Sequence, residues 1–385
     1  MTNLIFWFIT PPNNMKLFIE EVANIWNGSV TVIACHEMRA ERKNTGYSEE
    51  IKNVDCFIIL DKIKNPHKYA MKFIDDHHDD IHIFGGLRKE PAPYMYYLRG
   101  KYKNAKILAI TEKPALNSGT LVKRIIKKVS QNIIYPLTYL KAMKAVDILL
   151  VVGNSGISAI KKYGWSRDNI YNFMYSDNNV SEDFSDKCES KVKYLYVGRF
   201  DYRMRGLDTL INAFDGLRDD NWSLSLVGGY GSDAAEVIEW ANRTPNVSFL
   251  GTWAANEVMD KMKQFDVYIC PVNEDSWNGQ INMAISAGLA VISTNQAGSD
   301  ELVSQSGAGK VIANADVVAL RYAISQLNNN IEIVNMWKMN ARNYAACISA
   351  YSLARYFIDL IDCKITKKSM VCTCPWLKNV RDGEE

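Results

Sequence analysis

The stretch KYLYVGRFDYRMRGLD, residues 193–208, joins an apolar run to a glycine turn and to arginines. The apolar, aromatic-rich run at 193–197 is typical of a buried strand. Gly198 then lets the backbone turn tightly. Arg199 and Arg205 place two guanidinium groups behind the strand, and guanidinium suits bidentate capture of phosphate oxygens. The stretch therefore predicts a strand that feeds an anion-binding loop.

Apolar runs of this kind alternate with stretches of helical period along the chain. The expected strands before residue 176 are Asn3–Ile9, Val30–Cys35, Cys56–Leu60, Ile81–Phe84, Ile107–Ile110 and Ile148–Val152. Those after it are Lys193–Val197, Leu224–Val227, Ser248–Leu250, Val267–Pro271, Ala290–Ser293 and Val311–Ile312. Near-continuous apolar strands separated by helices indicate parallel sheets covered on both faces. The sequence predicts an α/β protein of two doubly wound, Rossmann-like domains that face each other across a cleft.

The polar stretch at 176–183 has no apolar period and is the expected linker between the domains. We predict a first domain over 1–180 and a second over 190–343. A final helix over 344–361 is expected to return to the first domain, and 363–385, with Cys372 and Cys374, is expected to be a flexible tail.

The composition is that of an ordinary globular protein. Of the 385 residues, 48% are apolar and 23% are charged, and 22 Gly and 10 Pro exclude collagen-like and low-complexity chains. The net charge of +2 gives no overall field that would attract nucleic acid. The charge is uneven, because residues 1–180 carry 25 basic and 17 acidic residues, a net of +8, and the remainder a net of −6.

The sequence favours a cytoplasmic location. The apolar run at 3–9 lacks a basic flank and a cleavage site, so we expect a strand there and no secretion signal. No apolar run reaches the length of about 18 residues that spans a bilayer. The eight cysteines are scattered, several of them within apolar runs, which is typical of reduced thiols.

Further motifs follow the strands of the second half in a fixed order. A glycine turn, Gly228-Gly229-Tyr230-Gly231, follows one strand, and glycines there permit close approach of a phosphate or sugar. The segment 271–280, PVNEDSWNGQ, precedes a helix expected over 281–287. The N-terminus of that helix would present free N–H groups and a positive dipole to an anion. The segment 297–303, AGSDELV, comes last.

This ordered set resembles the nucleotide-sugar domain of the GT-B glycosyltransferases, most closely glycosyltransferase family 4, over about residues 191–360. The resemblance implies a retaining hexosyltransferase that uses a nucleoside diphosphate sugar, with UDP as the default nucleotide. It implies an acceptor that is lipid-linked or a polysaccharide, as in O-antigen, capsule and lipopolysaccharide biosynthesis. It implies no cofactor and no metal, in keeping with the lack of an Asp-x-Asp motif.

The resemblance also implies roles for individual residues. Arg199, Arg205 and Gly279 are expected to bind the donor diphosphate. Asp275 matches the first of two family glutamates, which binds the donor sugar, and Glu274 is the rival acid. The second position holds Met283, which cannot hold ribose hydroxyls, so Gln280 or Asn282 takes over that contact or the chain is a degenerate relative. The remaining expected donor-side residues are Gly228, Gly229, Trp253 and Asn278.

The first half is expected to bind the acceptor. Asn13 and Asn14 follow the first strand, and Gly85 and Gly86 follow another, beside the basic pair Arg88-Lys89. Glu112 stands at the strand end where the family places a catalytic or orienting polar residue, and its carboxylate can accept the proton of an attacking hydroxyl. A surface pair with Lys113 is the simpler alternative for Glu112.

Residues 121–129, LVKRIIKKV, place four basic residues on one side of a helix and apolar residues on the other. A basic amphipathic helix indicates peripheral attachment to the inner face of a membrane. The alternative is an ordinary domain helix with its apolar side in the core. Two other functions stay open, an enzyme of the same fold acting on soluble sugars and a non-catalytic subunit.

Overall fold

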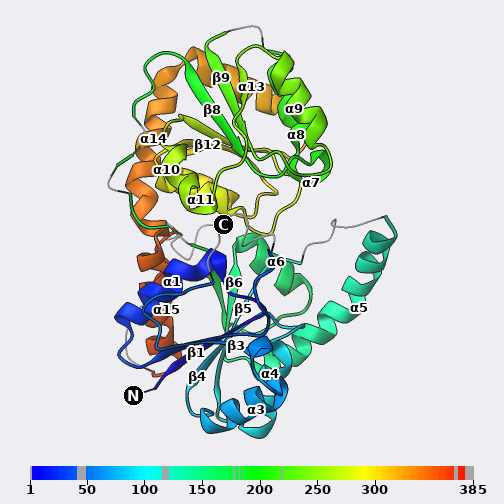
Figure 1. The fold of residues 1–385 in the computed structure, drawn as a ribbon, viewed down its shortest axis with the longest axis vertical. Coiled ribbons are helices and arrows are strands. Elements are labelled where there is room, and N and C mark those ends of the chain that lie inside the picture. The colour runs from blue at the N-terminus through cyan, green and yellow to red at the C-terminus, as the bar shows by residue number, and fades with distance from the viewer. Residues whose placement is uncertain are drawn as a thin grey trace. The chain divides into compact units, whose positions relative to one another are not determined.

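The computed structural model describes residues 2–40, 49–114, 121–176, 178–181, 183–184, 186–217, 220–367 and 372–377, with the side chains at 121–125 and 127–130 left out. These residues divide into two compact units (Figure 1). Unit 1 takes the described residues of Met1–Asp177 and Ala350–Cys374. Unit 2 takes those of Asn178–Ser349 and Pro375–Glu385. Each unit has a hydrophobic core of its own.

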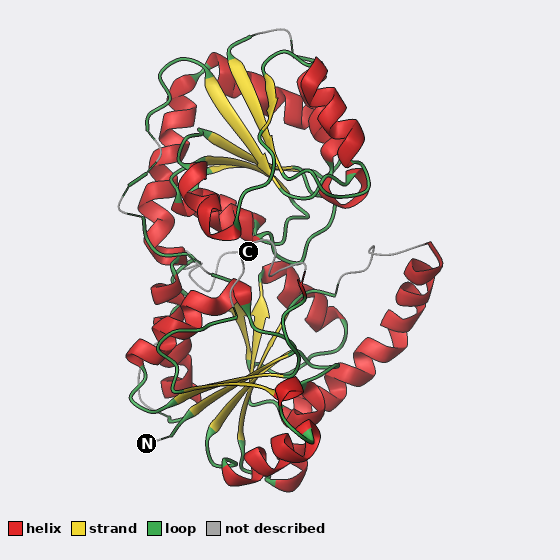
Figure 2. Cartoon of the chain, viewed as in Figure 1, coloured by secondary structure: helices red, strands yellow, loops and turns green. Residues whose placement is uncertain are grey.

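The centre of unit 1 is a sheet that is parallel throughout (Figure 2). Among the described residues its strands lie in the order β3-β2-β1-β4-β5-β6-β7. Most strand residues are β-branched or aliphatic, and β1 and β6 are buried at every position, as expected for a sheet covered on both faces. The strands are β1 (Leu4–Phe8), β2 (Val30–Ala34), β3 (Cys56–Ile59), β4 (Ile81–Gly85), β5 (Lys106–Thr111), β6 (Ile148–Val152) and β7 (Ile170–Phe173).

Helices cover both faces of this sheet because successive side chains of a strand point to opposite sides. On β1, Phe6 packs against Phe357 with the ring centroids 5.8 Å apart. The next residue, Trp7, packs against Phe73 and Tyr94 at 6.1 and 5.6 Å. The helical segments of unit 1 are η1 (Asn13–Met15), α1 (Lys16–Ile25), η2 (Leu60–Lys62), α3 (Pro66–Asp76), α4 (Ala92–Lys101), α5 (Leu121–Ala145), α6 (Asn154–Lys162) and α15 (Ala350–Lys364).

Unit 2 repeats this design with the strand order β10-β9-β8-β11-β12-β13, again parallel. Its strands are β8 (Val192–Val197), β9 (Trp222–Val227), β10 (Val247–Phe249), β11 (Val267–Cys270), β12 (Ala290–Thr294) and β13 (Gly309–Ile312). Its helical segments are α7 (Tyr202–Arg205), α8 (Leu207–Asp215), α9 (Ala234–Arg243), η3 (Ala255–Glu257), α10 (Val258–Met262), α11 (Gly279–Ser286), α12 (Asp300–Ser306), α13 (Val317–Asn329), α14 (Ile331–Ala345) and η4 (Ala346–Ile348).

The α/β class and the two doubly wound sheets predicted from the sequence are confirmed. The strand order reverses beside the first strand of each sheet, so that β1 lies between β2 and β4, and β8 between β9 and β11. At such a point the following connections leave toward opposite faces and open a crevice at the carboxyl ends of the strands. Each unit thus contains one place where a ligand site is expected.

The prediction of one helix over 344–361 is wrong. Between the end of α14 and the start of α15, Ser349 has an extended backbone, with φ −70° and ψ 157°. Its hydroxyl donates to the carbonyl of Ala346 at 2.9 Å. An extended residue cannot continue the helical ladder, so the chain leaves unit 2 here and re-enters unit 1 as α15, where Phe357 packs on β1.

The expectation of a flexible tail over 363–385 is wrong in part. α15 continues to Lys364, and Trp376, which is grouped with unit 2, is completely buried. The hydroxyl of Tyr344 donates to the carbonyl of Trp376. Burial of so large an apolar side chain stabilises this segment in the folded protein. Residues 368–371 and 378–385 lie outside the described residues.

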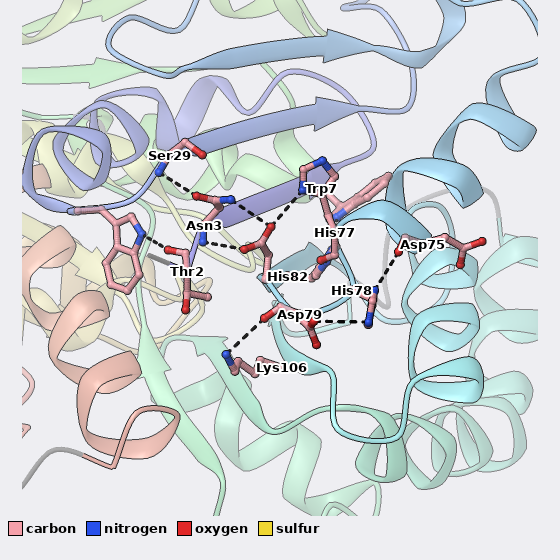
Figure 3. Close-up of polar contacts among 12 residues, drawn as sticks. Thr2, Asn3, Trp7, Ser29, Asp75, His77, His78, Asp79, His82 and Lys106 are labelled. Carbon is pink, nitrogen blue, oxygen red and sulfur yellow. Dashed lines mark hydrogen bonds and ion pairs between the residues drawn. The ribbon is translucent and has the colours of Figure 1, made fainter.

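A polar network ties β1 to β4 (Figure 3). His82 of β4 is fully buried. The indole Nε1 of Trp7 donates to its Nδ1 at 3.1 Å, and its Nε2 donates to the carbonyl of His77 at 3.0 Å. Because Nδ1 accepts a hydrogen bond, the imidazole is neutral, with its proton on Nε2. Burial lowers the pKa of His82 to about 4.

We expect this histidine to make stability depend on pH. The pKa of an unfolded histidine is about 6.5, so between about pH 6.5 and about pH 4 the unfolded chain binds a proton that the folded chain excludes. The free energy of unfolding should therefore fall by about 3 kcal/mol as the pH is lowered through this window. Urea unfolding at a series of pH values measures the loss. The variant His82→Asn offers Trp7 an acceptor that does not titrate, and an unchanged pH dependence in it would contradict the assignment.

Candidate functional site

A small cavity of about 80 Å³ lies in unit 2 at the carboxyl ends of β8 and β11, beside the reversal in strand order. Arg199 reaches it from the loop after β8, and Arg205 from the end of α7. Asn278 and Gln280 reach it from the start of α11. We call it the unit 2 cavity. It contains four of the donor-side residues that the sequence predicted.

An ion pair stands at this cavity. Nη1 of Arg205 contacts Oδ2 of Asp275 at 2.5 Å, and the two side chains are only 22% and 19% exposed. The side-chain amide of Asn278 donates to the same carboxylate oxygen at 3.4 Å. Burial opposes the charge on Arg205, but Asp275 outweighs it, so the pKa of the guanidinium is raised above its ordinary value. The guanidinium is therefore permanently charged and held in one orientation.

Two buried polar atoms at the cavity have no hydrogen-bond partner among the described residues, Nε of Arg205 and Oδ1 of Asn278. Such an atom costs about 1–3 kcal/mol when nothing satisfies it. The side chain of Arg199 is exposed and makes no ion pair with any described residue. Together these groups offer two cations and an unsatisfied donor and acceptor to a polar ligand.

The start of α11 adds a further anion-binding element. Asn278 stands at its N-cap with an extended backbone, and no side chain caps the helix. The first N–H groups of a helix lack intrahelical acceptors and lie at the positive end of its dipole. Gly279, the first residue of α11, has nothing within 4 Å of where its Cβ would be. An oxyanion can approach the backbone closely there.

Three further titratable side chains of the cavity wall are neutral. Burial raises the pKa of the Cys270 thiol to about 12, with a further contribution from Asp275. Burial also raises the pKa values of the Tyr196 and Tyr268 phenols. Sequence reasoning missed these three side chains. Their position near the carboxyl ends of strands that flank the reversal was the one available signal.

Glycines bring the loops of the cavity together. Gly206 has φ +64°, and a Cβ there would lie 1.9 Å from the carbonyl oxygen of Pro271. Gly228 has φ +148°, and its Cβ would lie 2.0 Å from the carbonyl oxygen of Gly198. Gly229 follows with φ +96°. Backbone-to-backbone contact thus joins the loops after β8, β9 and β11, and no other residue type fits at these points.

The other predicted donor-side residues of unit 2 do not line the described cavity. Trp253 packs against Phe265 with the ring planes tilted and the ring centroids 6.2 Å apart. Asn282 is buried and accepts a hydrogen bond from the indole of Trp277 at 3.0 Å. Glu274 is buried as well, while Met283 is half-buried on α11. The alternatives that gave Asn282 or Trp253 a contact with the donor remain predictions.

A larger cavity, of about 600 Å³, lies in unit 1 at the carboxyl ends of β1, β4 and β5. We call it the unit 1 cavity. Asn14, Gly85, Gly86 and Glu112, all predicted on the acceptor side, line it. Asn13 does not, because it is buried and its side-chain amide points to the sulfur of Met38 at 3.7 Å.

Three tyrosines that the sequence did not indicate form part of the wall, Tyr135 and Tyr139 of α5 and Tyr175. Burial and the nearby charge of Glu112 raise the pKa of Tyr175 well above its ordinary value. Glu112 therefore lies close to this phenol. Their spacing in the sequence places Tyr135 and Tyr139 on the same face of a helix. Only the packing of α5 in the structure places that face at the carboxyl ends of the strands.

The predicted membrane helix corresponds to the start of α5 (Leu121–Ala145). Its basic side chains at 123, 124, 127 and 128 lie outside the described side chains. Among those described, Ile126, Ile133, Ile134, Leu137 and Leu140 are exposed, by 49–62%. No helix within the described part of the chain is long and apolar enough to span a membrane.

Comparison with known proteins identifies a family for part of unit 2. Residues 191–330 match the family described as glycosyl transferases group 1. Over 177 residues the chain is 24% identical to the uncharacterized glycosyltransferase MJ1069 of Methanocaldococcus jannaschii. That alignment covers 43% of this chain and 44% of the relative, so less than half of the relative's length is matched.

Similar solved structures cover nearly the whole of the described fold. WaaG, a glycosyltransferase involved in lipopolysaccharide biosynthesis, has a TM-score of 0.63 at 15% identity, over 94% of this chain and 99% of its own. Anabaena Alr3699/HepE in complex with UDP has a TM-score of 0.68 at 12% identity, over 94% and 100%. The lipopolysaccharide outer core galactosyltransferase WaaB has a TM-score of 0.66 at 13% identity, over 95% and 100%. At these identities the likeness shows a shared fold.

We expect Gly228→Ala to destabilise the protein by at least about 2 kcal/mol, because the new Cβ would clash with a backbone carbonyl and would require an unfavourable φ. Thermal and urea unfolding measure the loss. The control Gly100→Ala lies in α4, where a Cβ meets nothing within 4 Å, and it should be neutral or stabilising by up to about 1 kcal/mol. Equal unfolding temperatures for Gly228→Ala and the unmodified protein would show that the loop contact is dispensable.

Proposed function

Since residues 191–330 match the family described as glycosyl transferases group 1, we propose that the chain is a glycosyltransferase of the GT-B fold that transfers a hexose from a nucleoside diphosphate sugar to an acceptor hydroxyl, with retention of configuration. The observation that carries the proposal is the unit 2 cavity, where Arg199, Arg205 and the start of α11 gather at the reversal in strand order. This cavity falls within residues 191–330, the segment that matches the family.

In the proposed reaction the bond from the anomeric carbon to the diphosphate oxygen breaks, and the leaving diphosphate keeps the electron pair. Arg199, Arg205 and the N–H groups of α11 stabilise the negative charge that develops there. Asp275 and Asn278 hold the guanidinium of Arg205 in place, and Asp275 retains an oxygen for a sugar hydroxyl. The new bond forms to the acceptor oxygen, and Glu112 of unit 1 orients that hydroxyl and accepts its proton. The positive groups perform the charge neutralisation that a metal ion would otherwise supply.

A uridine nucleotide is the proposed donor carrier. The support is the similar Alr3699/HepE structure, which is a complex with UDP. A lipid-linked or polysaccharide acceptor in cell-surface glycan biosynthesis, such as O-antigen or capsule, is the proposed second substrate. The support is the likeness to WaaG, described as involved in lipopolysaccharide biosynthesis, and to WaaB, described as a lipopolysaccharide outer core galactosyltransferase.

Attachment to the inner face of the membrane through α5 is part of the proposal. The exposed side chains Ile133, Leu137 and Leu140 follow helical spacing and form one apolar stripe. In Figure 1 the first turns of α5 extend away from the other helices of unit 1. The basic residues at 123–128 would place positive charge against anionic headgroups.

A non-catalytic role is the second candidate, favoured by Met283, where the family has a glutamate that binds ribose. Such a subunit would bind a nucleotide sugar but would not transfer the sugar to an acceptor. An enzyme of the same fold acting on soluble sugars would show turnover but no affinity for vesicles.

Calorimetric titration with UDP, GDP, ADP and dTDP tests the donor site. We expect one nucleotide to bind, and Arg199→Gln and Arg205→Ala to weaken it about tenfold to a hundredfold, because each removes a charged hydrogen bond worth about 1.5–3 kcal/mol. Arg243→Gln, an exposed arginine on α9 paired with Glu239, is the matched control and should bind as the unmodified protein does. If none of the four nucleotides binds, the donor site is refuted. If one binds but its sugar is never transferred, the non-catalytic role gains support.

Sedimentation with vesicles tests the membrane contact. We expect binding to phosphatidylglycerol vesicles, weaker binding to pure phosphatidylcholine, and a loss of about tenfold or more for the double variant Ile133→Ser and Leu137→Ser, since each substitution removes several buried CH₂ groups. The double variant Val318→Ser and Tyr322→Ser, which removes exposed apolar side chains from α13, is the control. Equal partitioning of both double variants would contradict the role of α5.

A further inference from the structure

The unit 1 cavity carries an excess of positive charge. Its described lining contains three cations, Arg88, Lys89 and Lys113, and one carboxylate, Glu112. All four follow the carboxyl ends of β4 and β5, so they gather at one edge of the sheet. A cavity with this lining favours an anionic ligand over a neutral one.

The cations of this cavity are not neutralised by other described residues. Arg88, Lys89 and Lys113 make no ion pair and no side-chain hydrogen bond with other described residues. Glu90, next in the chain, is paired instead with His36 at 2.8 Å. The charge of Glu112 acts on Tyr175. The positive groups are therefore available to a ligand.

Arg88 is the best placed of the three. Its guanidinium carbon lies 4.1 Å from the ring centroid of Tyr135, over the face of a ring that is itself buried. Stacking on an aromatic face orients the planar guanidinium and leaves its N–H groups free at the edge. Such a fork matches the paired oxygens of a phosphate or a carboxylate.

The rest of the cavity suits a sugar. Tyr135 and Tyr139 supply apolar ring surface, and Gly86 leaves open space where a side chain would stand. Gly86 has φ +113°, and nothing lies within 4 Å of its Cβ position. The volume of about 600 Å³ is within the usual range for small-molecule sites.

We propose that the unit 1 cavity selects an acceptor sugar that bears an anionic oxygen group, with Arg88 binding that group through its guanidinium fork and Lys113 assisting. That the bound sugar is the acceptor rests on the proposed function. That it is anionic rests on the charged lining of the cavity. A phosphate and a carboxylate present the same paired oxygens, and the test below separates them.

Calorimetry on the full chain, saturated with UDP so that the unit 2 cavity is occupied, provides the test. The probes are glucose 6-phosphate, methyl glucuronide and neutral methyl glucoside. We expect at least one acidic sugar to bind about tenfold or more tightly than the glucoside. Binding of the phosphate alone identifies a phosphorylated acceptor, and binding of the glucuronide alone identifies an acidic sugar. Equal affinity for all three probes, or no binding of either acidic sugar, overturns the proposal.

Variants then locate the contact. Arg88→Gln should weaken the acidic sugar about tenfold to a hundredfold, and Arg88→Lys should retain part of the affinity, because it keeps the charge and loses the fork. Arg355→Gln, an exposed arginine on α15 of the same unit, is the matched control and should bind normally. An unchanged thermal unfolding temperature of Arg88→Gln shows that the variant is folded. An acidic sugar that binds Arg88→Gln as tightly as the unmodified protein overturns the proposal.

The two proposals fail separately. If UDP does not bind the unmodified chain, the proposed donor site fails, and the acidic-sugar titration is repeated without nucleotide in Arg205→Ala, where phosphate capture at the unit 2 cavity is removed. Selective binding that still depends on Arg88 then supports the anion site on its own.

Discussion

Parallel pairing of the strands is the constraint on which the rest of this structure depends. A parallel strand can be reached only by a crossover, so the carboxyl ends of all the strands in a sheet lie at one edge. Where the order reverses, between β1 and β4 and between β8 and β11, neighbouring connections leave toward opposite faces. Both cavities lie at these reversals, and the lining residues come from distant segments, from Phe8 to Tyr175 in unit 1 and from Tyr196 to Gln280 in unit 2.

The two cavities use positive charge differently. In unit 2, Arg205 is held by the half-buried carboxylate of Asp275, which also accepts a hydrogen bond from the amide of Asn278, so its orientation is set before a ligand arrives. Preorganised charge of this kind stabilises a developing anion without reorganisation during the reaction. In unit 1, Arg88 is oriented by a ring face, which leaves its full charge available. The first arrangement suits a group whose charge changes, and the second suits a group that is already charged when it binds.

Sequence reasoning was most accurate where the pattern is local. Strands such as β6, predicted over Ile148–Val152 and found there, consist of continuous apolar residues whose burial needs no further information. The order of the motifs also predicted one donor site, and four of the residues predicted for it line the unit 2 cavity, namely Arg199, Arg205, Asn278 and Gln280. It failed at Ser349, because a single extended residue ends a helix without a glycine or proline to mark it. It also failed at Trp376, which is buried and whose carbonyl accepts a hydrogen bond from Tyr344, a residue distant in sequence.

By itself the sequence determined the α/β class, the two sheets and the positions of the loops that carry arginines, because hydrophobic period and glycine turns act over a few residues. Only the tertiary structure decided which charges meet. The pairing of Arg205 with Asp275, the stacking of Arg88 on Tyr135 and the burial of His82 against Trp7 each join residues 47–75 positions apart. Contacts over such separations depend on strand order and helix packing, and no local pattern in the chain encodes them.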